Sequence, residues 1–342
     1  MIGGFDLTDR EVLLIGTETG SRRATARYRA AGARVRRLTE SALPLSGDAP
    51  GWRALLASVA LCVIVEAAEH RAEQLRRYGR RFGVLIGSEP AAVSSGRVTL
   101  IGGGPGPEDL LTVAAVRALA EADVVCYDRL APHGRLAELA PAAELIDVGK
   151  RPYHHPVGQD GINELIVRHA RAGRAVVRLK GGDPYVFGRG AEEVAACREA
   201  GIEVRVLPGV TSAVAVPGAA GIPVTRRGVS RSVTVLSGHE LPPAEELAAL
   251  ARLGGTLVIM MGVANLPQLG AGLVRAGMDP ATPAAVVERG FRPGQRTTVS
   301  TLGGLPGEAS RVGVRSPAVI VLGEVVRCAT DAHQVLSMIG VP

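Results

Sequence analysis

The sequence predicts an α/β protein in which buried parallel strands alternate with helices. Short apolar runs such as Val98–Ile101 recur along the chain and are separated by segments with helical periodicity. Most of these runs end in a loop rich in glycine or polar residues. An unbroken apolar run fits a strand that is covered on both faces, as strands of parallel sheets are.

The composition restricts the kind of protein that this chain can be. A hydrophobic content of 46% in 342 residues excludes a disordered chain, and 3% aromatic residues are too few for the stacking platforms of single-strand nucleic-acid binding. The apolar runs are too short to cross a membrane, and the N-terminus does not resemble a signal peptide. We therefore expect a cytoplasmic protein without nucleic-acid or membrane partners.

Cysteine and lysine are used sparingly. The four cysteines form no C-x-x-C pair, so neither a zinc site nor a disulfide framework is expected, and the adjacent His154 and His155 have no further ligand spaced to help them. The net charge is +6, and among 39 basic residues only Lys150 and Lys180 are lysines. Because an ammonium can give up a proton and a guanidinium cannot, these two lysines are candidates for chemistry.

Residues 1–95 form the first predicted unit, a reduced Rossmann-like domain. We expect strands and helices to alternate in a βαβ pattern. The predicted strands are 12–15, 35 onward, 60–65 and 82–86, and the predicted helices are 21–31 and 67–78. The helical arginines Arg22, Arg23, Arg27 and Arg29 are expected to form a solvated face, with nucleic-acid or partner binding as the alternative.

The order of strand, glycine turn, arginine-containing helix and Ala-Gly-Ala-x-Val resembles the NAD-binding domain of siroheme synthases. Only Gly16 and Gly20 remain of the glycine run, Glu18 stands where a pyrophosphate would be repelled, and Gly87 replaces the expected aspartate. We therefore expect a remnant that does not use NAD. The alternatives are an NAD-dependent oxidoreductase, and a binding module that passes product to a separate dehydrogenase or chelatase.

Residues 91–96 are a predicted linker, and residues 96–228 form the second predicted unit. Its predicted strands are 98–101, 124–127, 145–148, 175–179 and 203–206, and its predicted helices are 110–120, 162–172 and 192–200. Because the carboxyl ends of parallel strands meet at one edge, their loops should converge on one crevice.

Residues 229–342 form the third predicted unit. Its predicted strands are 232–236, 256–260, 284–287, 297–301 and 318–322, its predicted helices are 245–253 and 266–276, and a short helix is expected to close the chain.

The loop after the first strand of the second unit has an unusual composition. Four glycines allow close approach of a ligand, namely Gly102, Gly103, Gly104 and Gly106. Pro107, however, stands where G-x-G-x-x-G requires glycine, and Glu108 and Asp109 follow. Two prolines and an acid pair suit a pyrophosphate poorly. A neutral or cationic nucleotide-like ligand fits better, and a simple strand-to-helix turn is the alternative.

From about residue 97 to 326 the motifs resemble the tetrapyrrole methylase family, and within it the uroporphyrinogen-III C-methyltransferases of siroheme and cobalamin synthesis. The matching segments follow in order across the second and third units. They are Val98–Gly106, Ala122–Leu130, Gly149–Arg151, His155 with Gln159, Val177–Pro184, Phe187–Gly190, Pro208–Ser212, Gly221–Pro223, Gly238–His239 and Met261–Gly262.

The resemblance implies the two-domain tetrapyrrole methylase fold, α/β throughout, preceded here by the small Rossmann-like domain. It implies S-adenosylmethionine as methyl donor, two C-methylations of uroporphyrinogen III at ring positions 2 and 7 to give precorrin-2, and a homodimer. The alternatives are a methylase for a later corrin precursor and a diphthine-type enzyme.

The resemblance also implies site residues. The methyl-donor site would be lined by Pro105, Gly181, Gly182, Asp183, Val186, Thr211, Ser212, Met261 and Gly290. Asp128 is implied as the general base and Lys150 as the acid or charge stabiliser. The substrate has eight carboxylates, and arginine forks bind carboxylates well. The candidate hydrogen-bond donors to the substrate carboxylates are Arg129, Arg151, His155, Arg226, Arg227 and His239.

Overall fold

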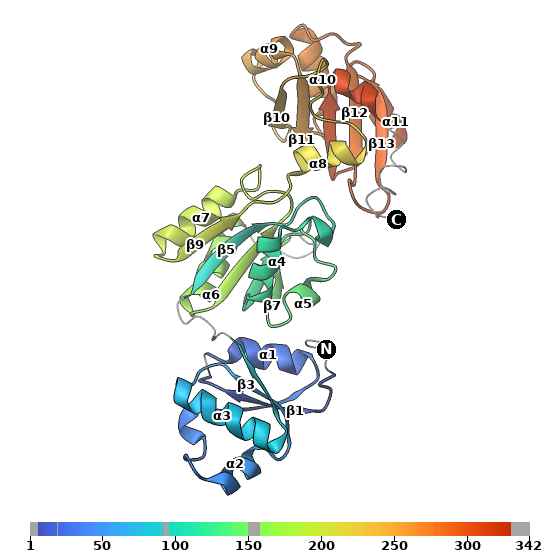
Figure 1. The fold of residues 1–342 in the computed structure, drawn as a ribbon. Coiled ribbons are helices and arrows are strands. Elements are labelled where there is room, and N and C mark those ends of the chain that lie inside the picture. Colours follow the sequence, from blue (N-terminus) through green and yellow to red (C-terminus); the bar gives the residue numbers. More distant parts are fainter. Residues whose placement is uncertain (1–5, 19, 90, 92–95, 150–157, 330–342) are drawn as a thin grey trace.

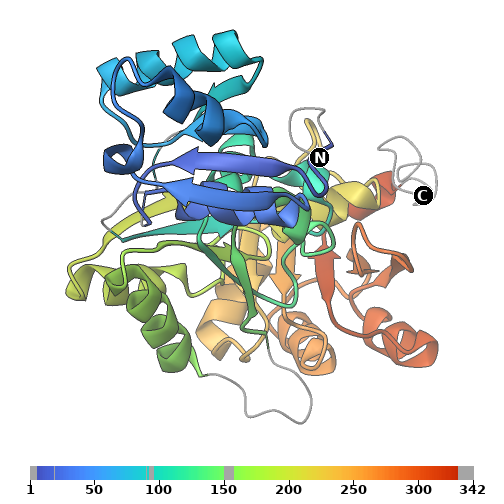
Figure 2. The ribbon, with the colours of Figure 1, turned by 90° about the horizontal axis from the view of Figure 1, so that it is seen from below.

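The chain forms three β-sheets that lie one after another in a row. The structure is a computed structural model that describes residues 6–18, 20–89, 91, 96–149 and 158–329. Figure 1 shows the N-terminal, middle and C-terminal sheets from bottom to top, and Figure 2 looks along the row from the N-terminal end. The three sheets span 11–88, 97–207 and 233–322, each within one predicted unit. The boundaries between the units stay a proposal.

The N-terminal sheet has the strand order β2-β1-β3-β4, and all its strand pairs are parallel. Helices α2 and α3 pack on one face and α1 packs on the other, the face toward the middle sheet (Figure 1). The elements are β1 (Glu11–Ile15), α1 (Arg22–Ala30), β2 (Arg34–Leu38), α2 (Ala49–Leu56), β3 (Val59–Ile64), α3 (Glu69–Phe82) and β4 (Leu85–Ser88).

The middle sheet is also fully parallel, with the order β7-β6-β8-β5-β9. Helices α6 and α7 cover one face, and α4 and α5 cover the other. The elements are β5 (Arg97–Gly102), α4 (Val113–Ala120), β6 (Val124–Tyr127), α5 (Leu136–Leu139), β7 (Glu144–Asp147), α6 (Gln159–Arg171), β8 (Ala175–Lys180), α7 (Gly190–Glu199) and β9 (Glu203–Leu207).

The C-terminal sheet is mixed, with the order β10-β11-β14-β12-β13, in which only β10 and β11 pair in parallel. Helices α9, α10 and α11 pack on one face and α8 packs on the other. The elements are α8 (Ser212–Ala219), β10 (Val233–Ser237), α9 (Ala244–Leu253), β11 (Thr256–Met260), α10 (Leu266–Arg275), β12 (Pro283–Glu288), β13 (Arg296–Thr301), α11 (Leu305–Val312) and β14 (Ala318–Leu322).

The structure confirms the α/β class and differs from the predicted elements in several places. The strand predicted at 82–86 begins only at Leu85, because α3 continues to Phe82 and Gly83 ends it in a left-handed conformation. Helices α2, α5, α8 and α11 are not among the predicted helices; α2, α8 and α11 each contain a proline-glycine pair, which weakens a helical pattern, and α5 is only four residues long. The predicted closing helix falls largely on residues 330–342, outside the described residues; η3 (Glu324–Cys328) is a 3₁₀ helix.

The expectation of a solvated arginine face on α1 is wrong for its first turn. The Arg22 guanidinium donates to Asp123 Oδ2 at 2.7 Å and to the carbonyl of Gly173, also at 2.7 Å. Arg23 Nε lies 3.2 Å from Asp123 Oδ1, and Arg23 is buried. Asp123 immediately precedes β6 of the middle sheet, so both arginines pair across the contact between the N-terminal and middle units, where Arg22 stays 25% exposed. On the last turn, Arg27 Nη1 lies 3.2 Å from Glu89 Oε1, and only Arg29 is exposed as expected.

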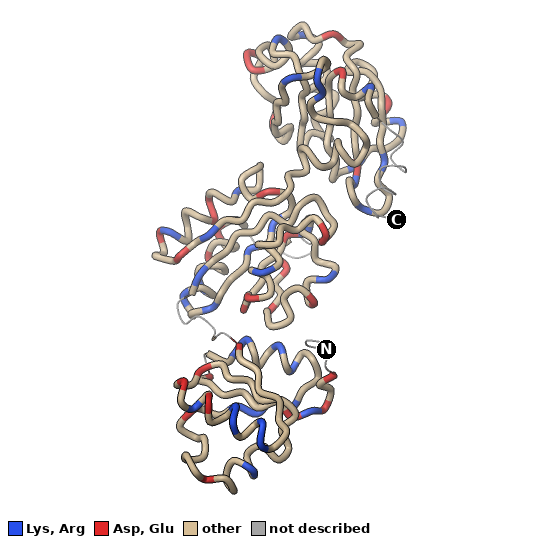
Figure 3. The backbone as a smooth tube through the Cα atoms, in the orientation of Figure 1, with Lys and Arg blue, Asp and Glu red and all other residues tan. Residues whose placement is uncertain are grey.

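Charged residues of both signs are interspersed over all three units (Figure 3). Within the described part of the chain, no helix is long and apolar enough to span a bilayer.

Candidate active site

The loops after β5, β8 and β9 meet at the carboxyl edge of the middle sheet. Gly103 N–H donates to the carbonyl of Lys180 at 2.7 Å, and Gly104 and Gly182 exchange two backbone hydrogen bonds. A methyl group on Gly102 would lie 2.4 Å from the nitrogen of Gly209, so the loops approach with backbone against backbone. Glycine is required here because any side chain would separate the loops.

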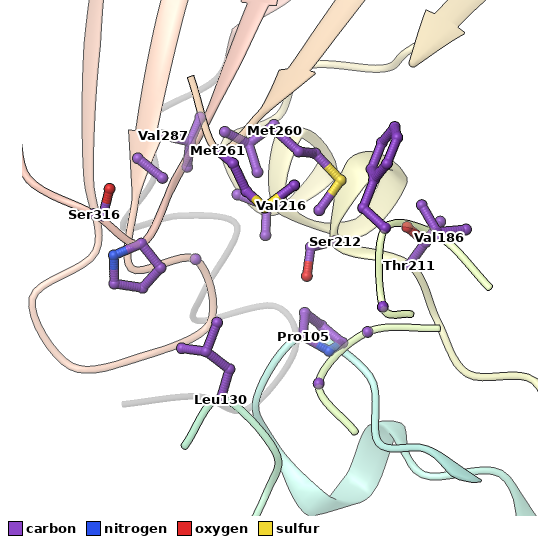
Figure 4. A pocket seen from close by; sticks show the side chains of 18 of the residues that line it. Pro105, Leu130, Val186, Thr211, Ser212, Val216, Met260, Met261, Val287 and Ser316 are labelled. Atoms are coloured by element: carbon purple, nitrogen blue, oxygen red, sulfur yellow. The ribbon is translucent and has the colours of Figure 1, made fainter. Parts of the chain in front are cut away.

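A cavity of ≈ 520 Å³ opens above this edge, between the middle and C-terminal sheets. In Figure 4, Pro105 and Leu130 of the middle unit lie on one side of it, and Met260, Val287 and Ser316 of the C-terminal unit lie on the other. All nine residues predicted for the methyl-donor site line this cavity. They are Pro105, Gly181, Gly182, Asp183, Val186, Thr211, Ser212, Met261 and Gly290.

Asp183 joins two of the loops at the cavity wall. Its Oδ1 accepts the N–H of Tyr185 at 2.9 Å, which forms a local turn, and its Oδ2 accepts the N–H of Gly209 at 3.0 Å. The turn expected from Gly-Asp-Pro is therefore present, and the same carboxylate also ties the loop after β8 to the loop after β9. It places one negative charge at the wall of the cavity.

Three residues of the cavity wall have left-handed backbone conformations, which residues other than glycine rarely adopt. Phe187, Met261 and Arg289 have φ values of 54°, 56° and 50°. Such conformations persist where the surrounding structure enforces them, and they concentrate at functional sites. Met261 is 47% exposed, so it faces the open space and does not fill the core.

The candidate catalytic residue Asp128 directly follows β6, next to the cavity-lining Arg129 and Leu130. Its Oδ1 accepts a hydrogen bond of 2.6 Å from Arg178 Nη2. Asp128 is therefore ion-paired, but with the buried Arg178 and not with its neighbour Arg129. The other catalytic candidate, Lys150, lies outside the described residues.

The structure separates the substrate-binding candidates into three groups. Arg129 and His239 line the cavity. Arg226 and Arg227 are exposed and do not line it; Arg226 Nη1 donates to Cys328 Sγ at 2.8 Å. Arg151 and His155 fall outside the described residues.

Two further arginines, which sequence reasoning missed, line the cavity. Arg289 and Arg292 line it from the loop after β12, and Arg292 Nη2 donates to the carbonyl of Leu130 at 2.7 Å, across from the C-terminal unit to the middle one. Burial and the nearby charge of Arg129 lower the pKa of Arg292. The segment Glu288-Arg289-Gly290 directly follows a predicted strand, and this position was the signal that could have pointed to Arg289.

In the glycine turn of the N-terminal unit, the side chain of Glu66 lies against Thr17 and Gly20. Glu66 Oε2 accepts the N–H of Thr17 at 2.8 Å and its hydroxyl at 2.5 Å. A methyl group on Gly20 would lie 2.2 Å from Glu66 Cδ. Glu18, expected to repel a pyrophosphate, instead has an 85% exposed side chain. The acidic group against the turn is therefore Glu66, which the sequence reasoning did not single out.

Among the residues that the structure describes, no cluster of three His, Cys, Asp or Glu side chains could hold a metal ion. Burial raises the pKa of Cys126 to about 11, so this buried thiol of β6 is protonated at neutral pH.

Comparison with known proteins supplies the chemistry of close relatives. Residues 97–306 match the family described as tetrapyrrole (corrin/porphyrin) methylases. The S-adenosyl-L-methionine-dependent uroporphyrinogen III methyltransferase of Methanosarcina barkeri is 47% identical over 235 residues, which cover 68% of this chain and 92% of that protein.

A siroheme synthase of Hydrogenovibrio crunogenus is 38% identical over 285 residues, which cover 83% of this chain and 60% of that protein. This likeness is longer than residues 97–342 and therefore extends into the N-terminal unit. The crystal structure of uroporphyrin-III C-methyl transferase from Thermus thermophilus, complexed with S-adenosylhomocysteine, has a TM-score of 0.58 and 44% identity and covers 68% of this chain and 99% of that chain.

Proposed function

This chain belongs to the tetrapyrrole (corrin/porphyrin) methylase family, and from that membership we propose that it methylates uroporphyrinogen III with S-adenosylmethionine to give precorrin-2. Two successive transfers, at ring positions 2 and 7, release two molecules of S-adenosylhomocysteine. The observation that carries the proposal is the cavity between the middle and C-terminal sheets, because it is lined by all nine residues that the family resemblance assigns to the methyl donor.

The cavity fits S-adenosylmethionine in size and in chemistry. Its volume of ≈ 520 Å³ falls in the range of about 300–1,000 Å³ that small-molecule sites have. The donor supplies a methyl group on a positively charged sulfur. The Asp183 carboxylate gives the wall one negative charge, Thr211 and Ser212 contribute hydroxyl groups, and Gly181, Gly182 and Gly290 expose backbone to the ligand.

Asp128 is proposed as the general base. When a pyrrole carbon accepts a methyl group, the ring carries a positive charge until a proton leaves it. A carboxylate at the end of β6, next to cavity-lining residues, can take that proton. Arg129, Arg289 and Arg292 supply guanidinium groups for the substrate carboxylates.

The homodimer implied by the family likewise stays a proposal, and light scattering would measure the oligomeric state.

The test is incubation with uroporphyrinogen III and methyl-labelled S-adenosylmethionine. We expect two labels per product, with and without NAD⁺. D128N should lower kcat by about 10²- to 10⁴-fold, the usual contribution of a general base, while S-adenosylhomocysteine affinity stays within twofold. D279N, an exposed turn aspartate of the C-terminal unit, is the control. Full activity of D128N would show that another group takes the proton.

A further inference from the structure

Strand β8 of the middle sheet buries two cations. Arg178 and Lys180 are 2% and 3% exposed, although the segment 175–179 reads as an apolar strand. A buried charge costs several kcal/mol of desolvation unless it is paired, and replacing such a pair by apolar residues is often neutral or stabilising. Stability alone is therefore a weak reason for these residue types.

Every nitrogen of the Arg178 guanidinium has a partner. Nε donates to Glu193 Oε1 at 2.9 Å, and Nη1 donates to the carbonyls of Leu179 at 3.1 Å and Cys126 at 3.4 Å. Nη2 donates to Asp128 Oδ1 at 2.6 Å. This fixed, planar fork leaves the arginine a single orientation, which a lysine at the same position would not have.

Glu193, on helix α7, fixes the position of the Arg178 guanidinium. Its side chain is fully buried at the start of α7, and it also accepts from Lys180 Nζ at 3.0 Å. The two cations and two carboxylates balance in charge. Burial lowers the pKa of Arg178, but the charges of Asp128 and Glu193 outweigh this effect and raise the pKa above its ordinary value. The guanidinium therefore stays protonated.

One end of this network adjoins the candidate site, because Asp128 directly precedes the cavity-lining Arg129 and Leu130. The Asp128 side chain is 31% exposed, whereas those of Arg178, Lys180 and Glu193 are 4% exposed or less. Only its Oδ1 is engaged: among the described residues, no partner for Oδ2 is found. The network thus holds one oxygen of Asp128 and leaves the other, in a partly exposed side chain that adjoins the cavity-lining Arg129, without a partner among the described residues.

We propose that Arg178 is a positioning residue that orients the Asp128 carboxylate for proton removal, with Glu193 and Lys180 fixing the orientation of Arg178. This inference rests on the proposed function of Asp128 as the base. Loss of the fork lets the carboxylate rotate away from the ring proton, and misplacement of this kind lowers kcat more than it changes binding.

The test compares R178K and E193Q with the wild type. R178K keeps the charge and loses the fork, and E193Q keeps the shape of the anchor. We expect each to lower kcat at least tenfold while KM for S-adenosylmethionine stays within twofold. R174K is the matched control, because Arg174 lies beside the same strand and pairs with Glu144, without a contact to Asp128. It should retain kcat within twofold.

The decisive measurement repeats R178K in the D128N background. A residue that acts only through Asp128 has nothing left to position there, so R178K should change the residual kcat by less than twofold. A merely structural role would lower activity equally in both backgrounds and would overturn the inference. If R178K does not fold, the same comparison with E193Q decides.

Failure of the inference differs from failure of the proposed function. A D128N enzyme with full activity would remove Asp128 as the base, and with it the role of Arg178. An inactive D128N together with a fully active R178K and E193Q would retain the base and overturn only the positioning role.

Discussion

Asp183 Oδ2 accepts the backbone N–H of Gly209 at 3.0 Å, which closes the cavity wall between the loops that follow β8 and β9. The same carboxylate accepts the N–H of Tyr185, so both of its oxygens hold backbone that lines or adjoins the candidate donor site. A hydrogen bond to a charged acceptor is worth about 1.5–3 kcal/mol.

We therefore expect D183N to weaken S-adenosylhomocysteine binding by about ten- to a hundredfold, because the amide can accept at only one of its two positions. Isothermal titration calorimetry measures this directly. D279N is the matched control, since Asp279 Oδ1 also accepts an N–H two residues ahead, at 2.8 Å from Ala281, but lies away from the cavity. Equal affinities of D183N and the wild type would contradict the assigned role.

Arg292 should affect substrate binding more than turnover. Its guanidinium joins the two sides of the cavity through the carbonyl of Leu130 and lies near the charge of Arg129. We expect R292A to raise KM for uroporphyrinogen III about tenfold, with kcat within threefold, in steady-state assays. R275A, at the exposed end of α10, should change neither value. An unchanged KM in R292A would exclude a carboxylate contact.

The contact between the N-terminal and middle units should be sensitive to acid. Burial raises the pKa of Asp123, but the hydrogen bonds from Arg22 and from the N–H of Ala175, together with the charge of Arg23, lower it to below the usual 3.8. A carboxyl group with a lowered folded-state pKa stabilises the folded protein above its unfolded-state pKa and loses that contribution as the pH falls further.

D123N leaves both arginines without their carboxylate, and we expect a loss of about 3–5 kcal/mol at neutral pH. In calorimetric melts, the Tm difference between wild type and D123N should be constant from about pH 6 to 8 and shrink below about pH 4. E121Q should cost at most about 1 kcal/mol, because Glu121 is 60% exposed in its pair with Arg97. A difference that does not depend on pH would contradict the ionic contact.

The N-terminal glycine turn should accept a nucleotide only when Glu66 is removed. Thr17 N–H now donates to Glu66, and in dinucleotide folds the corresponding N–H groups bind phosphate. We expect E66A to bind NAD⁺ at least tenfold more tightly than the wild type in a fluorescence titration. E69A, which changes an exposed glutamate of α3, should match the wild type. Tight NAD⁺ binding by the wild type would show that the turn is open.

The sequence alone determined the α/β class, most strands, and the nine methyl-donor candidates that line the cavity. Strand pattern and glycine loops are local signals, and in a parallel sheet a strand end is also a position at the ligand-binding edge. For this reason the loops that carry Gly181, Asp183 and Thr211, two of them far apart in the chain, could be placed at one crevice from their positions after predicted strands, and the family resemblance assigned these residues to the methyl donor. The family motifs added Met261 and Gly290 from the third unit, whose sheet is mixed and offers no such rule.

Only the tertiary structure decided which charged residues are buried and with whom they pair. Arg22 with Asp123, Glu66 with Thr17, and Arg178 with Asp128 are each separated by 49 residues or more along the chain. A local pattern records the periodicity of one helix or strand, but whether a charged side chain meets solvent or a partner depends on the surface packed against it. The prediction of a solvated face on α1 was wrong for that reason, because the middle unit lies against the first turn of the helix.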